Sequence, residues 1–161
     1  MEKINVLFVC LGNICRSPLA EAIFTKMVEE KGLSDQINID SAGTANYHIG
    51  ERPDPRTIDN ARANGVELLS RARQFVSADF ELYDYIIPMD DSNLQNIIKL
   101  KPDSGIHNYK VIKMRKFDPE QKGADVPDPY YGGAQGFQNV FDILKRSNEH
   151  FIEHLLNEHN F

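Results

Sequence analysis

The chain has 161 residues, of which 41% are hydrophobic and 26% charged, and its formal net charge is −6. This length and composition are typical of a soluble globular protein, and we expect residues 1–161 to form a single domain. The acidic balance argues against nucleic acid or an anionic membrane surface as the main partner. No segment approaches the roughly 18 apolar residues of a membrane span.

The N-terminal segment carries no export signal that we can identify. Its apolar run, residues 6–9, is too short for the core of a signal peptide, and no small-residue cleavage site follows it. The two cysteines, Cys10 and Cys15, lie in one short stretch and do not form the disulfide framework of a secreted protein. We expect a cytoplasmic protein that is a monomer or a weak dimer.

Apolar strands and amphipathic helices alternate along the chain. Four short segments are typical of strands: residues 4–9, 37–39, 85–87 and 109–114. Five segments have helical patterns: residues 18–30, 55–64, 77–82, 93–100 and 136–156. Ser17, Ser77 and Ser92 are the predicted N-caps of three of these helices. A long polar connection, residues 115–133, precedes the last helix.

This alternation predicts an α/β fold. We expect a doubly wound domain with a four-stranded, mostly parallel sheet and helices on both faces. In such sheets, ligands bind beyond the carboxyl ends of the strands. The loop after the first strand is therefore the first place to look for a functional site.

That loop, residues 10–17, reads Cys-Leu-Gly-Asn-Ile-Cys-Arg-Ser and leads into a helix that Pro18 begins. The backbone N–H groups of a strand-to-helix loop and the helix N-terminus together attract an anion such as phosphate. Gly12 and Asn13 are best able to adopt the left-handed backbone that such a loop requires. Arg16 offers a planar set of donors that suits phosphate oxygens.

Cys10 is the candidate nucleophile of this loop. The amides, the helix terminus and Arg16 favour its thiolate form, and a thiolate beneath a bound phosphoryl group is placed for in-line attack. The Ser17 hydroxyl is near enough in sequence to donate a hydrogen bond to the sulfur. The alternative makes Cys10 a small buried core residue and Arg16 a solvated cation at a helix end. The position of the loop between a buried strand and a Pro-started helix favours catalysis.

Residues 6–18, Val-Leu-Phe-Val-Cys-Leu-Gly-Asn-Ile-Cys-Arg-Ser-Pro, resemble the low-molecular-weight protein tyrosine phosphatases, and residues 128–132, Asp-Pro-Tyr-Tyr-Gly, resemble the acid-loop motif of that family. Further similar stretches lie at residues 40–43, 53–56, 72–74 and 89–94. The resemblance spans essentially the whole chain. It implies the family's fold, hydrolysis of phosphotyrosine in a protein substrate through a phosphocysteine, and no cofactor or metal.

Cleavage of a phosphomonoester also needs an acid that protonates the leaving oxygen. Three Asp-Pro pairs supply candidates, which begin at Asp54, Asp118 and Asp128. Asp128 is favoured because two tyrosines and two glycines follow it, which puts aromatic surface and turn-forming residues beside the carboxyl group. The resemblance implies the same choice, with Asp128 later acting as the base that activates water. The alternative is an aspartate that only begins a turn.

The resemblance also assigns the substrate-binding residues: Leu11, Gly12, Asn13, Ile14, Cys15, Ser17, Tyr47 and Tyr130. It implies that Tyr47 and Tyr130 form the walls of the cleft, although Tyr47 is alternatively an exposed loop residue. Asn13 and Ser41 are implied to hold the loop in shape through hydrogen bonds. Where the family often has His, this chain has Ser70, which forms hydrogen bonds but has no titratable ring.

Cys15 and two histidines have competing interpretations. The resemblance implies a reversible disulfide between Cys15 and Cys10 that protects the nucleophile, whereas Cys15 is alternatively a small buried filler. His150 and His154 share a helix face and could bind a metal ion. Glutamates flank both of them, so we interpret the pair as a solvated helix face and expect no metal site.

Three other functions are less well supported. Arsenate reductases of this fold use further cysteines downstream, and none follows Cys15. Phosphoarginine phosphatases tend to carry Thr where this chain has Ile14, so the apolar residue favours tyrosine. A non-catalytic phosphotyrosine-binding module is disfavoured because Cys10, Arg16 and Asp128 are all present.

Overall fold

A parallel sheet forms the centre of the computed structural model, which describes residues 2–102 and 107–161. Within these ranges the sheet has four strands, in the order β2-β1-β3-β4: β1 (Ile4–Cys10), β2 (Ile37–Gly43), β3 (Tyr85–Pro88) and β4 (Lys110–Val111). Every pairing is parallel. Cys10 of β1 lies opposite Gly43 of β2, so the carboxyl ends of both strands meet at one edge of the sheet.

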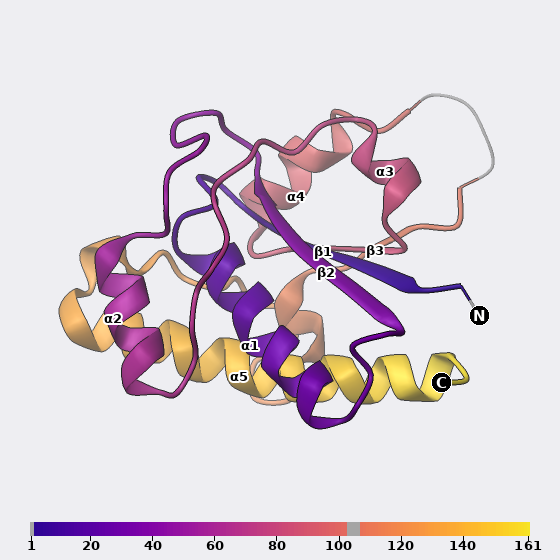
Figure 1. Ribbon diagram of the computed structural model, residues 1–161. Coiled ribbons are helices and arrows are strands. Elements are labelled where there is room, and N and C mark those ends of the chain that lie inside the picture. The colour runs from indigo at the N-terminus through magenta and orange to yellow at the C-terminus, as the bar shows by residue number, and fades with distance from the viewer. Residues whose placement is uncertain (1, 103–106) are drawn as a thin grey trace.

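Helices cover both faces of this sheet (Figure 1). On one side lie α1 (Arg16–Glu30), α2 (Pro55–Ala63) and the long α5 (Gly133–Glu158), and on the other lie α3 (Asp79–Leu82) and α4 (Asp91–Ile98). The predicted doubly wound α/β fold is therefore confirmed, and the sheet is parallel throughout.

Two apolar clusters, one on each face, hold the layers together. On the α1 and α5 side, Phe8 meets Phe24 and Phe151 edge to face, with ring centroids 5.7 and 6.2 Å apart. On the α3 and α4 side, Phe80 and Ile97 pack against the opposite face of β1 and β3. Burial of β1 from both sides explains its continuous apolar sequence.

The helix starts differ from the predictions. The first helix begins at Arg16 with Cys15 at its N-cap, so the prediction that Ser17 caps it was wrong. Ala78 rather than Ser77 precedes α3, and α4 is capped by Asp90 rather than Ser92. The Asp90 carboxylate takes this role because it accepts the Asn93 N–H at 2.7 Å.

The C-terminal third also differs from the predicted pattern. The fourth strand has two residues instead of the predicted 109–114, and Lys113, beyond its end, pairs with Asp91 and Asp125. The polar connection contains two short 3₁₀ helices, η1 (Met114–Phe117) and η2 (Pro129–Tyr131), and α5 starts at Gly133 instead of residue 136. No helix in the described parts of the chain is both long and apolar enough to cross a membrane.

Candidate active site

Residues 10–17, here called the nucleophile loop, turn tightly at the carboxyl end of β1 and lead into α1. Asn13 adopts the predicted left-handed backbone, with φ of 57°, whereas Gly12 does not. A Cβ at Gly12 would lie 3.0 Å from His48 Cδ2, so a larger residue there would require a small shift of the His48 ring. Gly43 at the end of β2 meets the same loop, and its Cβ would lie 2.7 Å from the Leu11 carbonyl oxygen.

Cys10 lies at the bottom of the loop and is 3% exposed. Its Sγ is 3.0 Å from Ser17 Oγ and accepts the Asn13 N–H at 3.3 Å. The sulfur therefore has two hydrogen-bonding partners within its own loop. Hydrogen bonds donated to a sulfur stabilise its charged form.

A chain of hydrogen bonds supports the loop from behind, and we call its members, Asn13, Ser17, Ser41 and Glu21, the support network. Asn13 Nδ2 donates to Ser17 Oγ at 2.8 Å and to Ser41 Oγ at 2.9 Å. Ser41 Oγ in turn donates to Glu21 Oε1 at 2.5 Å. Asn13 also accepts the Arg73 N–H at 3.1 Å, which satisfies both ends of its amide.

Glu21 ends this network and was not predicted from the sequence. Burial raises the pKa of its carboxyl group to about 7, although hydrogen bonds from Ser41 and Ser70 lower it in part. Ser70 therefore contacts the network through Glu21, in the place where the family often has His. No sequence signal distinguishes Glu21 from the other glutamates of α1.

Arg16 is buried beside Cys10 and is held by two acceptors. Its Nη1 donates to Asp90 Oδ2 at 2.6 Å and to the Val126 carbonyl oxygen at 3.0 Å. Burial lowers the pKa of Arg16, but the negative charges of Cys10 and Asp90 outweigh that effect and leave the pKa above its usual value. Asp90 was missed as a partner, although its position at the carboxyl end of β3, the neighbour of β1, could have indicated it.

A cleft of about 140 Å³ opens above Cys10. Its walls come from the nucleophile loop, the segment after β2 and the turn before α5: Cys10, Leu11, Gly12, Ile14, Cys15, Arg16, Tyr47, His48, Asp128 and Tyr130. Tyr47 and Tyr130 remain 70% and 57% exposed at its rim. His48, which the sequence interpretation missed, lines the cleft with its Nδ1 2.6 Å from Glu51 Oε2.

Not every residue of the predicted substrate-binding set lines this cleft. The side chains of Asn13 and Ser17 are buried and belong to the support network instead. Ser41 lies in that network as predicted, through its bond from Asn13 Nδ2.

The three Asp-Pro aspartates lie in different surroundings. Asp54 caps α2 and pairs with Arg56. Asp118 is fully buried, where the Arg146 hydrogen bonds hold the pKa of its carboxyl group well below the usual range. Asp128 is exposed, lines the cleft, and accepts the Tyr130 N–H on Oδ1 at 2.9 Å.

Cys15 lines the same cleft but differs from Cys10 in its surroundings. Burial raises the pKa of its thiol to about 12, and a hydrogen bond with Thr57 lowers it only in part. Both cysteines are free. Cys15 is therefore a protonated thiol at neutral pH.

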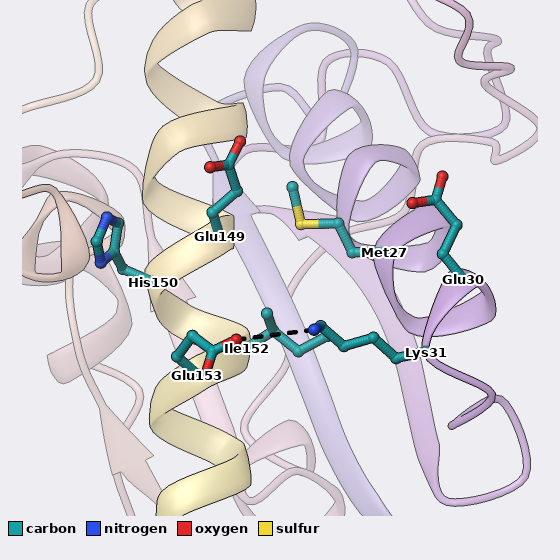
Figure 2. Close-up of a pocket in the computed structure, with 7 residues that line it drawn as sticks. All are labelled: Met27, Glu30, Lys31, Glu149, His150, Ile152 and Glu153. Atoms are coloured by element: carbon teal, nitrogen blue, oxygen red, sulfur yellow. Dashed lines mark ion pairs between the residues drawn. The ribbon is translucent and has the colours of Figure 1, made fainter.

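A second, larger hollow lies between α1 and α5 and contains none of the residues of the nucleophile loop. It is lined mainly by charged side chains (Figure 2). Lys31 Nζ crosses it to Glu153 Oε1 at 3.7 Å. His150 belongs to this hollow, while His154 packs on the Phe117 ring with centroids 5.3 Å apart. Across residues 2–102 and 107–161, no three His, Cys, Asp or Glu side chains are grouped to hold a metal ion.

Comparison with known proteins agrees with this geometry. Residues 5–160 match the family model for low molecular weight phosphotyrosine protein phosphatase. The protein of that name from Schizosaccharomyces pombe is 43% identical over 153 residues, which cover 94% of this chain and 97% of that one.

Solved structures are similar as well. A protein tyrosine phosphatase from Entamoeba histolytica has a TM-score of 0.91 at 40% identity, over 97% of this chain and 99% of that one. A drosophila arginine phosphatase has a TM-score of 0.84 at 32% identity, over 93% and 96%. The match to the family model and to these relatives spans nearly the whole chain, so this protein belongs to the low molecular weight phosphotyrosine protein phosphatase family.

Proposed function

We propose that this phosphatase hydrolyses phosphotyrosine in protein substrates, with Cys10 as nucleophile and Asp128 as general acid and base. The observation that carries the proposal is the juxtaposition at the cleft: a sulfur with two hydrogen-bonding partners at the bottom, and a carboxyl group at the rim. Arg16, fixed by Asp90, supplies a buried cation to the same cleft.

In the first step, Cys10 Sγ attacks the phosphorus in line with the leaving phenolic oxygen. The S–P bond forms as the P–O bond breaks, and Asp128 transfers its proton to the departing oxygen. Arg16 and the loop amides stabilise the charge on the three equatorial oxygens. The products of this step are free tyrosine side chain and phosphocysteine.

In the second step, Asp128, now ionised, takes a proton from a water molecule that attacks the same phosphorus. The S–P bond breaks and Cys10 leaves as a thiolate, to which Ser17 Oγ, 3.0 Å away, donates a hydrogen bond. Inorganic phosphate is released. Asp128 is then protonated again and Cys10 is again a thiolate, as both were before the first step.

The lining of the cleft supports an aromatic substrate. Tyr47 and Tyr130 lie at the rim, and Leu11 and Ile14 add apolar surface. A flat phenyl ring suits such walls. Phosphoarginine is the second candidate, because a structural relative is named an arginine phosphatase, but the apolar Ile14 in the cleft favours tyrosine.

We further propose that the enzyme acts in the cytoplasm as a monomer or a weak dimer and that oxidation joins Cys15 to Cys10 reversibly. Support for the disulfide comes from the position of both residues on one small cleft. The Cys15→Ser variant should then lose its recovery by added thiol after peroxide treatment.

The proposal is tested by assaying phosphotyrosine, phosphoserine and phosphoarginine side by side, without added metal. We expect turnover of phosphotyrosine that disappears in Cys10→Ser and that falls in Asp128→Asn by about 10²–10⁴-fold for poor leaving groups. Full activity of Cys10→Ser would exclude the mechanism. Faster turnover of phosphoarginine would keep the mechanism and replace the substrate.

A further inference from the structure

We propose that Arg56 is a positioning residue, which ties the turn that carries Asp128 to the nucleophile loop. Residues 126–132 are here called the acid loop. The inference rests on the proposed role of Asp128 as general acid. It concerns a residue of α2 that does not line the cleft and that the reaction steps above do not use.

Arg56 bridges two aromatic rings that are far away in the sequence. Its guanidinium carbon lies 4.8 Å from the centroid of the Tyr130 ring and 4.9 Å from that of Phe137. A guanidinium group at this distance is attracted to the face of each ring. Phe137 is buried in the first turns of α5, so it provides a fixed surface on which Arg56 and then Tyr130 are stacked.

The other side of Arg56 is anchored to the nucleophile loop through Asp54. Arg56 Nε and Nη2 donate to the two carboxylate oxygens of Asp54, at 3.1 and 2.9 Å. The Asp54 N–H in turn donates to the Ile14 carbonyl oxygen at 2.8 Å. The paired geometry restricts the guanidinium to one plane, which a single hydrogen bond would not do.

The contact with Tyr130 is transmitted to Asp128 within one short turn. The Tyr130 N–H donates to Asp128 Oδ1, and the two residues lie on either side of Pro129 in η2. Both side chains are exposed, so the loop gains little from burial at this point. The contact of Arg56 with the Tyr130 ring therefore contributes to the orientation of the acid.

Direct binding of an acidic substrate residue is the competing role for Arg56. Its charge is already paired with Asp54 and its faces meet two rings, although 49% of the side chain remains exposed. The two roles differ in their consequences. Positioning of the acid affects small aryl phosphates, which carry no flanking residues, whereas binding of a flanking residue affects only peptides.

The test compares Arg56→Met with Arg62→Met, an exposed arginine of the same helix whose partner is Glu67. The kcat/KM of each variant is measured on two substrates: phenyl phosphate, which has a poor leaving group, and p-nitrophenyl phosphate, which has a good one. We expect Arg56→Met to lose about tenfold on phenyl phosphate and less than about threefold on p-nitrophenyl phosphate, as for a misplaced acid. Arg62→Met should match the parent on both, and Arg56→Lys should lie between them.

A second measurement places Arg56→Met in an Asp128→Asn background. If Arg56 acts through the acid, the double variant should have the same kcat/KM as Asp128→Asn alone. Equal losses on both aryl phosphates, or a further loss in the double variant, would overturn the inference, as would a loss confined to acidic phosphopeptides. An Asp128→Asn enzyme without any leaving-group dependence would instead overturn the proposed acid itself.

Discussion

The nucleophile loop and the acid loop meet at one cleft but are built in opposite ways. In the nucleophile loop Cys10, Arg16 and the residues that support them are buried. The support network holds the loop around Cys10, and Asp90 holds Arg16, before any substrate arrives. In the acid loop, Asp128 and Tyr130 are exposed; Asp128 accepts the Tyr130 N–H within one turn, and Arg56 packs on the Tyr130 ring.

The difference follows from what each loop does under the proposed function. Groups that stabilise charge in the transition state are most effective when they are fixed in advance and shielded from water. The acid must instead meet an oxygen that belongs to the substrate, and a position at the rim allows the tyrosine side chain to enter and leave. Damage to the first loop should therefore affect all substrates alike, and damage to the second should depend on the leaving group.

The largest effect is expected from Arg16→Ala. The variant loses the buried cation that stabilises the equatorial oxygens and leaves the Asp90 carboxylate without its partner at 2.6 Å. We expect kcat/KM to fall by about 10³-fold or more, equally on p-nitrophenyl and phenyl phosphate. Thermal unfolding measured by circular dichroism serves as the folding control. A loss of less than about tenfold would contradict the role given to Arg16.

Asn13→Ala should have the next largest effect. The change removes the amide that joins Ser17 to Ser41, and it places a Cβ residue without a compensating side chain at φ of 57°. We expect kcat/KM to fall by about 10- to 100-fold with no leaving-group dependence. A loss confined to phenyl phosphate would show that the support network serves the acid instead.

Two glycine substitutions form a matched pair, one for each loop. A Cβ at Gly43 would lie 2.7 Å from the Leu11 carbonyl oxygen, and a Cβ at Gly132 would lie 2.9 Å from Gly136 Cα. Each Gly→Ala change should cost about 1–3 kcal/mol of stability, since backbone must move to make room. Kinetics should then separate them: Gly43→Ala lowers kcat/KM uniformly, and Gly132→Ala lowers it mainly on phenyl phosphate. The reverse assignment would contradict the comparison.

The smallest effect on kcat/KM is expected from Glu21→Gln, whose effect on stability depends on pH. Because burial raises the pKa of Glu21 to about 7, above its value of 4.5 in an unfolded chain, the folded state opposes ionisation. The stability this group contributes is fully present below about pH 4.5 and is lost as the pH rises through about 7. Gln cannot ionise, so relative to the parent the variant should gain about 3 kcal/mol of stability when the pH is raised from about 4.5 to about 8. Urea unfolding at both pH values measures this.

The exposed Glu29 of the same helix provides the control for that measurement. Glu29→Gln should leave the difference between the two pH values unchanged. If Glu21→Gln behaved in the same way, Glu21 would be ionised in the folded protein at neutral pH, and the support network would end in a charge.

Much of the nucleophile loop could be predicted from the sequence because its chemistry is local. A buried strand, a helix with Pro18 in its first turn and the residues that join them determine where Cys10 and Arg16 lie in the fold. The α/β alternation determines the sheet. The partners of this loop were harder to predict, because Gly43 and Glu21 meet it only through tertiary packing, and Asp90 is indicated only by its position at the carboxyl end of β3.

Errors at the helix starts have a similar origin. A serine near a helix start indicates an N-cap only when no stronger interaction competes for it. Ser17 Oγ instead lies 3.0 Å from Cys10 Sγ, and the Asp90 carboxylate precedes Ser92 with a better acceptor. In both places the residue that the local pattern assigned to a helix end is displaced by the needs of the site.

The central claim is a covalent phosphocysteine on Cys10, and its most direct test is to trap it. The enzyme is mixed with p-nitrophenyl phosphate, denatured within milliseconds at alkaline pH, digested and analysed by mass spectrometry. We predict one phosphoryl group on the peptide that contains Cys10, none in the Cys10→Ser variant, and more of the intermediate in Asp128→Asn, where attack by water is slowed. A phosphoryl group on another residue, or steady turnover with no phosphorylated peptide, would contradict the account.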